Sequence, residues 1–69
     1  MACSIPIYCL MEIAYPDGSA GLRMEPDIAA ALDEASAAER SGAWRAERIT
    51  MGRETLLEGA ELRREIDAV

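Results

Sequence analysis

Five residue types are missing from the 69-residue chain, namely His, Lys, Asn, Gln and Phe. Without His and Lys, no side chain can supply the imidazole or the amine on which most acid–base and covalent enzymes depend. A chain of this length also buries only about 60% of the surface that its unfolded form exposes, which disfavours a large catalytic cleft. We therefore expect no enzyme, with carboxylate or thiolate chemistry as the remaining enzymatic alternative. The codon bias of a GC-rich genome produces the same absences. The missing residues therefore exclude imidazole and amine chemistry, but they do not indicate a function.

Positive charge is scarce as well. Seven Arg stand against 13 Asp and Glu, which gives a formal net charge of −6. Proteins that bind nucleic acid gain much of their affinity by neutralising phosphates with basic side chains, so direct nucleic-acid binding is not expected. A charged protein partner of this chain is expected to be basic.

Long apolar runs are absent too. The longest, residues 5–15, is interrupted by Pro6 and Glu12 and is shorter than the roughly 20 residues of a membrane span. The first basic residue is Arg23, so the basic N-terminal region of a secretory signal is missing. The two cysteines, Cys3 and Cys9, form no disulfide framework. We expect a cytoplasmic protein that does not enter a membrane.

What is present indicates a folded domain, because 51% of the residues are hydrophobic and 29% are charged. Residues 3–24 predict a β-hairpin whose turn is the Tyr-Pro-Asp-Gly of residues 15–18. The alternate positions that we expect to be buried on its first strand are Cys3, Ile5, Ile7, Cys9, Met11, Ile13 and Tyr15. On one strand the two cysteines lie about 20 Å apart, too far to bond to each other.

The register of this hairpin depends on the length of its loop. A four-residue loop, residues 16–19, places Ile13 opposite Leu22 on the buried side and Glu12 opposite Arg23 on the other. A three-residue loop instead places Glu12 opposite Leu22. Because like faces then no longer meet, we expect the four-residue loop.

A helix is predicted for residues 27–41. Pro26 and Asp27 are typical of a helix start, and Gly42 is typical of a helix end. The apolar stripe consists of Ile28, Ala31, Leu32 and Ala35. Since this stripe is narrow and rich in alanine, the helix must lie close to the sheet, and its alanines should not tolerate enlargement.

Residues 44–59 leave two interpretations open. A hairpin with a turn at Gly52 and Arg53 pairs Ile49 with Leu56, and we favour it. It also sets Glu47 against Glu58, an unfavourable pair. The alternative is a helical stripe made of Ala46, Ile49, Leu56, Leu57 and Ala60.

A short helix over residues 60–68 completes the chain, with an apolar stripe of Leu62, Ile66 and Val69. We therefore expect residues 1–69 to form a single small α+β domain in the order ββαββα. Its helices are expected on one face of a mainly antiparallel sheet.

Candidate chemical sites are few. The carboxylate pairs Asp33 with Glu34 and Glu58 with Glu61 fit solvated surfaces, and neither a metal-ligand pattern nor a phosphate-binding glycine loop is present. We expect no metal and no cofactor. Glu39 is unusual because it continues an apolar stripe, so it either reaches solvent or meets Arg45 or Arg48. The single tryptophan, Trp44, is expected in the core.

The outward positions of the first strand carry Tyr8 and Leu10, which either another chain or the chain's own terminal segment must cover. The leading hypothesis is a protein-interaction domain, such as a small acidic inhibitor or regulator of a nucleic-acid-binding protein. Its expected partner-binding residues are Tyr8, Leu10, Glu12, Asp27, Asp33 and Glu34. The alternative is an accessory subunit or obligate homodimer whose outward strand face is the interface.

Overall fold

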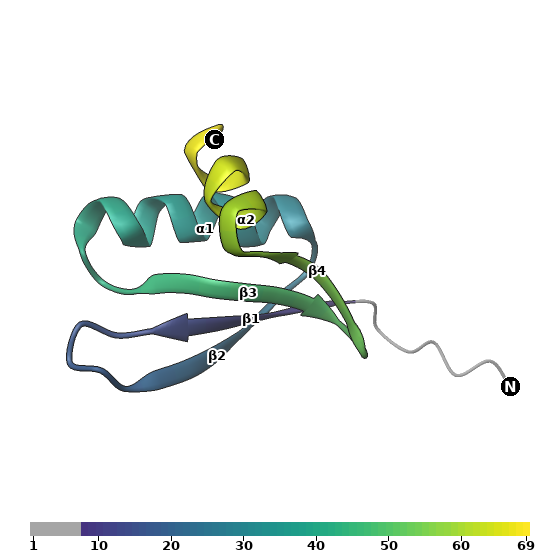
Figure 1. Ribbon diagram of the computed structural model, residues 1–69, viewed down its shortest axis with the longest axis horizontal. Helices are drawn as coiled ribbons and strands as arrows, with labels where there is room; N and C mark the ends of the chain where they lie inside the picture. The colour runs from purple at the N-terminus through teal and green to yellow at the C-terminus, as the bar shows by residue number, and fades with distance from the viewer. Residues whose placement is uncertain (1–7) are drawn as a thin grey trace, which may run out of the picture.

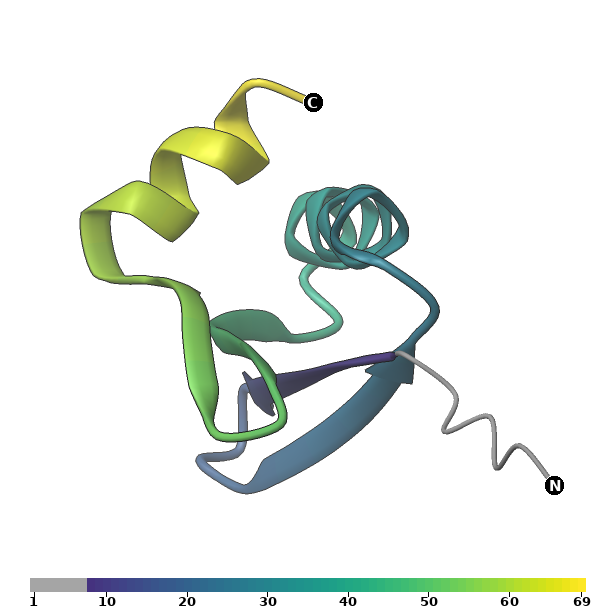
Figure 2. The same cartoon turned by 90° about the vertical axis from the view of Figure 1, so that its right-hand side faces the viewer.

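Two helices cover one face of a four-stranded antiparallel sheet in the computed structural model, which describes residues 8–69 (Figures 1 and 2). The elements are β1 (Cys9–Ala14), β2 (Ala20–Glu25), α1 (Ile28–Ser41), β3 (Arg45–Met51), β4 (Glu54–Glu58) and α2 (Gly59–Asp67). The strand order is β2-β1-β3-β4. The predicted ββαββα order and α+β class are confirmed, while the predicted burial of Cys3, Ile5 and Ile7 lies outside the described residues.

The core lies between β1, β3 and the two helices. Cys9, Met11 and Ile13 of β1 are fully buried, as the alternation predicts. Ala31 and Ala35 of α1 are also fully buried, so the small side chains allow the helix to approach the sheet closely.

Both ends of α1 are capped as the sequence predicts. The Asp27 carboxylate accepts a hydrogen bond from the Ala30 amide at 2.8 Å. At the other end Gly42 adopts a left-handed φ of 78°, and the Ala43 amide donates to the Ala38 carbonyl at 2.9 Å. These bonds satisfy backbone groups that a helix end otherwise leaves free.

The predicted register of the first hairpin is wrong. The Gly18 amide donates to the Tyr15 carbonyl at 2.9 Å, and the Tyr15 amide donates to the Ser19 carbonyl at 2.8 Å. Gly18 has a φ of 93°. This is a three-residue loop in which a left-handed glycine follows a tight turn. Glu12 therefore lies opposite Leu22, the pairing that the face-matching argument rejected.

The one-residue difference in register exchanges the two faces of β2. Leu22 and Met24 point away from the helices and are each 66% exposed. Arg23 and Glu25 lie on the helix side instead, where Glu25 is only 5% exposed. Tyr15, predicted to be buried, is exposed at the hairpin end.

The second hairpin is confirmed, and the helical interpretation of residues 44–59 is excluded. Thr50 pairs with Thr55, as predicted, but a bulge then shifts the register so that Ile49 pairs with Leu57 and Arg48 with Glu58. The predicted pairing of Ile49 with Leu56 is thus wrong. The extra residue replaces the expected pair of like charges with an attractive one.

The terminal helix α2 follows β4 without a loop, because Gly59 adopts a left-handed φ of 59°. Leu62 and Ile66 are buried against the core, as predicted. Val69 lies beyond the end of the helix and is exposed, so its predicted place in the apolar stripe is wrong.

Candidate functional site

The face of the sheet opposite the helices is covered by no described element (Figure 2). Leu22 and Met24 on β2 are its most exposed apolar side chains, and Leu10 on β1 lies directly opposite Met24. Neighbouring exposed apolar side chains of this kind are a candidate contact surface. We call this surface, with Leu10, Glu12, Leu22, Met24, Arg48 and Glu58, the open face.

Charged side chains form the half of the open face nearest β4. A shallow depression of about 1000 Å³ runs across the face. Arg48 lies between two carboxylates, with its Nε 3.6 Å from Glu12 and 3.8 Å from Glu58. Glu47 also lines the depression. Glu47 has an ion pair of its own with Arg45, at 3.9 Å. The two carboxylates of Glu12 and Glu58 against the one guanidinium of Arg48 leave this half with a net negative charge.

The structure separates the predicted partner-binding residues into two groups. Leu10 and Glu12 line the open face, and the exposed Tyr8 immediately precedes β1. The three acids predicted to flank this surface, Asp27, Asp33 and Glu34, belong to α1 or its cap, on the other side of the sheet. The predicted combination of outward strand and acidic helix flank is therefore not a single surface.

Two of those acids have partners within the chain. The Asp27 carboxylate caps α1, and Glu34 forms an ion pair with Arg23. Only Asp33 is exposed along the helix without such a contact among the described residues. The predicted pairing of Arg23 with Glu12 is likewise wrong, because Arg23 lies on the helix side.

Arg23 organises a small polar cluster beneath α1. Its Nε lies 3.6 Å from the Glu25 carboxylate, and its guanidinium stacks 5.4 Å from the centre of the Trp44 ring. Burial, followed by the nearby Glu34, raises the pKa of Glu25 above its ordinary value. The sequence does not predict this cluster, because the expected register places Arg23 on the opposite face of the sheet.

Cys9 is buried beside this cluster. Burial raises the pKa of its thiol, and the charges of Asp27 and Glu25 raise it further. Since the thiolate is the nucleophilic form, these surroundings disfavour reaction at Cys9. Its predicted place in the core is confirmed.

Glu39 and Arg63 form the most highly connected polar contact of the domain. Two hydrogen bonds join them, at 2.6 Å and 2.8 Å. The Ala46 amide donates to the Glu39 carboxylate at 3.0 Å, and Arg63 donates to the Ala46 carbonyl at 2.8 Å. The hydrogen bonds from Arg63 lower the pKa of Glu39. The predictions of solvent exposure, or of pairing with Arg45 or Arg48, are wrong, although an acid on an apolar stripe was the correct signal.

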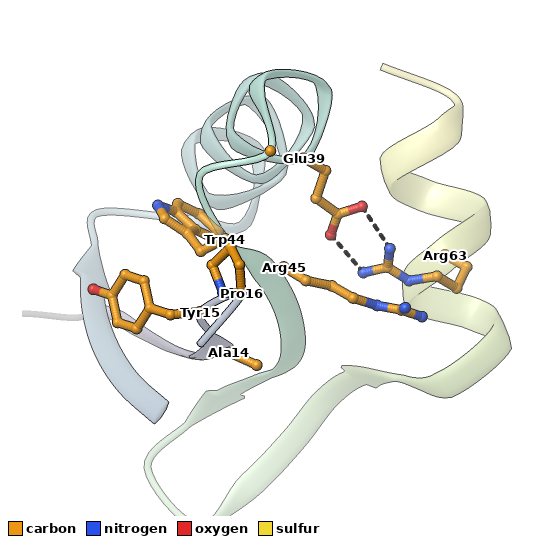
Figure 3. A pocket seen from close by; sticks show the side chains of 8 residues that line it. Ala14, Tyr15, Pro16, Glu39, Trp44, Arg45 and Arg63 are labelled. Atoms are coloured by element: carbon orange, nitrogen blue, oxygen red, sulfur yellow. Dashed lines mark hydrogen bonds and ion pairs between the residues drawn. The ribbon is translucent and has the colours of Figure 1, made fainter. Parts of the chain in front are cut away.

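A cleft of about 490 Å³ lies next to this ion pair, between the first hairpin turn and α2 (Figure 3). Tyr15, Pro16 and Trp44 lie on one side, and Arg45 and Arg63 lie toward α2. The volume is in the range of small-ligand sites. Tyr15 is expected in the core, and only the observed register of the first hairpin places it at this cleft.

Residues 8–69 contain no group of three or more side chains that could hold a metal ion. Within the same range, no helix has both the length and the apolar character to cross a membrane.

Comparison of the chain with protein families, curated proteins and solved structures found no match.

Proposed function

We propose that this chain is a non-enzymatic protein-interaction domain whose open face binds a basic, amphipathic segment of another protein. The observation that carries the proposal is the outward position of Leu22 and Met24, which are each 66% exposed beside Leu10. Covering two-thirds of a Leu or Met side chain contributes about 1–2 kcal/mol, so these two residues alone supply a useful part of a binding energy.

Charge complementarity supports a basic partner. The apolar side chains on β1 and β2 adjoin a half of the face on which Glu12 and Glu58 outnumber Arg48. A segment with apolar residues on one side and Lys or Arg beside them would satisfy both halves. The chain's net charge of −6 adds a long-range attraction to such a segment.

The same charges oppose a second copy of the chain as the occupant. A two-fold contact through the open face places this net negative surface against a copy of itself. It also joins two molecules that each carry a net charge of −6. A basic partner is therefore favoured over the homodimer, and a regulatory or inhibitory role would follow if that partner uses the covered surface itself.

Site-specific cross-linking followed by reconstitution tests this proposal. A photoreactive phenylalanine derivative at position 22 should cross-link to one basic protein in cells that express the chain, whereas the same group at the exposed position 37 of α1 should not. The identified protein is then purified and its affinity is measured directly. The double substitution L22S/M24S should weaken binding by at least about tenfold, which corresponds to 1.4 kcal/mol.

Two charge variants separate the open face from the helix flank. Glu12→Gln should weaken binding and make it less dependent on salt, because Glu12 lies on the open face. Asp33→Asn removes the same charge from α1 and should leave binding unchanged. A cross-link between two copies of the chain, an acidic partner, or equal effects of both charge variants would contradict the proposal.

A further inference from the structure

The two edge strands of the sheet differ in how they are protected. β4 carries a bulge, has Glu54 and Glu58 at its two ends, and continues directly into α2. β2 pairs with β1 in an uninterrupted register over residues 20–25 and contains no proline. No strand within residues 8–69 pairs with its outer side (Figure 1). Because bulges, prolines and charges keep an edge strand from pairing with another chain, β2 is the edge that is open to such pairing.

The outward backbone groups of β2 belong to the residues whose side chains lie on the open face. The Ser19 carbonyl accepts a hydrogen bond from the Tyr15 amide, so it points to β1. In an antiparallel pair, the backbone groups of successive residues point to opposite sides of the strand. The amides and carbonyls of Ala20, Leu22 and Met24 therefore point away from β1. An added strand meets the backbone groups and the exposed side chains of the same three residues.

The helix side of this edge is acidic. Glu34 contributes to the raised pKa of Glu25, and Glu25 and Asp27 both raise the pKa of Cys9, so the three acids lie near one another at the end of β2. Arg23 is the base that pairs with Glu25 and Glu34. Its guanidinium turns inward beneath α1 and does not project past the edge. Two acids outnumber this base even when Glu25 is protonated.

We propose that an extended segment of the basic partner joins the sheet as an additional strand, antiparallel to β2. The inference rests on the function proposed above and specifies how that partner binds. Apolar side chains of the segment lie beside Leu22 and Met24 on the open face, while alternate basic side chains face the acids on the helix side. Strand addition thus satisfies the outward backbone groups, the exposed apolar side chains and the local negative charge together.

A second copy of the chain is a poorer occupant of this edge. The one base of its β2 is Arg23, which is already paired with Glu34. A second copy therefore brings no unpaired base to the acids, and it also brings a net charge of −6. Charge complementarity favours a basic strand instead.

The test uses the synthetic peptide acetyl-Lys-Val-Lys-Val-Thr-Val-Thr-amide, whose valines alternate with Lys and Thr. An antiparallel strand whose valines lie on the open face directs the valine amides to β2 and the other amides to solvent. One derivative is N-methylated at the three valines. Its matched control carries the same three methyl groups on the second lysine and the two threonines.

Binding is followed through the amide resonances of the ¹⁵N-labelled chain. The parent peptide should shift the resonances of residues 20–25 to saturation. N-methylation of the valines should weaken binding by at least about tenfold, because it removes the donors that face β2, whereas the matched control should bind within about twofold of the parent. Replacement of both lysines with glutamate should also weaken binding by at least about tenfold.

The methylated pair separates strand addition from the function on which it rests. Equal binding by both derivatives would overturn strand addition and leave the proposed function standing, since apolar and charged contacts do not use the peptide's amides. Stronger binding by the valine derivative would indicate a parallel strand and overturn the antiparallel arrangement. No saturation at millimolar parent peptide, or a dimer of the chain in sedimentation equilibrium, would also overturn it. The cross-link at position 22 tests the function itself.

Discussion

Glu39 on α1 and Arg63 on α2 lie 24 positions apart in the chain and are joined by two hydrogen bonds. The same two side chains also bind both backbone groups of Ala46 at the start of β3. A single polar contact thus connects the two helices to each other and to the sheet. In a domain of 69 residues, this connection fixes the position of α2, which otherwise rests on few buried side chains.

Removal of Glu39 should therefore destabilise the whole domain. Glu39→Ala leaves the Arg63 guanidinium and the Ala46 amide without their acceptor, and it should lower the free energy of unfolding by about 2–3 kcal/mol. Arg63→Lys keeps the charge but loses the two-point geometry, so an intermediate loss of about 1 kcal/mol is expected. Urea denaturation measures both, with the exposed Arg64→Ala as the control. A loss for Glu39→Ala no larger than that of the control would show that this contact does not hold α2.

Substitutions at Met11 and Met24 test the register of the first hairpin. Both residues lie on neighbouring strands, but Met11 is fully buried and Met24 is 66% exposed. Met11→Ala should lower the free energy of unfolding by about 2–5 kcal/mol, whereas Met24→Ala should lower it by less than about 1 kcal/mol. The register expected from face matching buries both residues. Comparable losses for the two variants in urea denaturation would support that register instead.

The error in register has a definite physical cause. The alternation in β1 and the Pro-Asp-Gly turn are predicted correctly, and they fix the strands and the turn position. The four-residue loop is expected only because it buries the apolar residues of β2. The turn decides otherwise, because Gly18 takes a left-handed conformation and the Asp17 carboxylate accepts a hydrogen bond from the Ser19 amide at 2.9 Å. Local geometry thus places Leu22 on the open face.

Other parts of the candidate sites depend on contacts between distant segments. The signal at Glu39 was visible in the sequence, since an acid on an apolar stripe needs a partner. The choice of Arg63 over Arg45 follows from the way α2 packs beside α1, which no local pattern encodes. In the second hairpin, the expected conflict between Glu47 and Glu58 counts in favour of the helical alternative, which is wrong. A bulge instead removes the conflict, because it sets Glu58 opposite Arg48.

Close packing of α1 on the sheet gives a further prediction. Ala35 is fully buried, whereas Ala37, two positions later on the same helix, is exposed. Ala35→Leu should lower the free energy of unfolding by about 1–3 kcal/mol, because the core has no space for the added carbons. Ala37→Leu adds the same atoms on the solvent side and should change stability by less than about 0.5 kcal/mol. Thermal unfolding of the two variants checks this. Equal melting temperatures would show that α1 is not closely packed against β1 and β3 at Ala35.

Glu25 and Glu39 should affect the pH dependence of stability in opposite directions. The pKa of Glu39 is lowered from its ordinary value of 4.5, chiefly by hydrogen bonds from Arg63. Its stabilising effect is therefore fully present above pH 4.5 and is lost as the pH falls through the lower folded pKa. The pKa of Glu25 is raised from 4.5, chiefly by burial. Its stabilising effect is present below pH 4.5 and is lost as the pH rises through the folded pKa.

Glutamine substitutions separate the two groups, because each removes one titration and keeps the side chain's shape. The stability deficit of Glu39→Gln relative to the unsubstituted chain should be largest near neutral pH and should shrink as the pH falls below 4.5. The difference for Glu25→Gln should move in the variant's favour as the pH rises above 4.5. Urea denaturation at a series of pH values measures both. Parallel pH profiles for the two variants would contradict the assignment, since a buried acid beside Glu34 and an acid bound at two points by Arg63 cannot titrate alike.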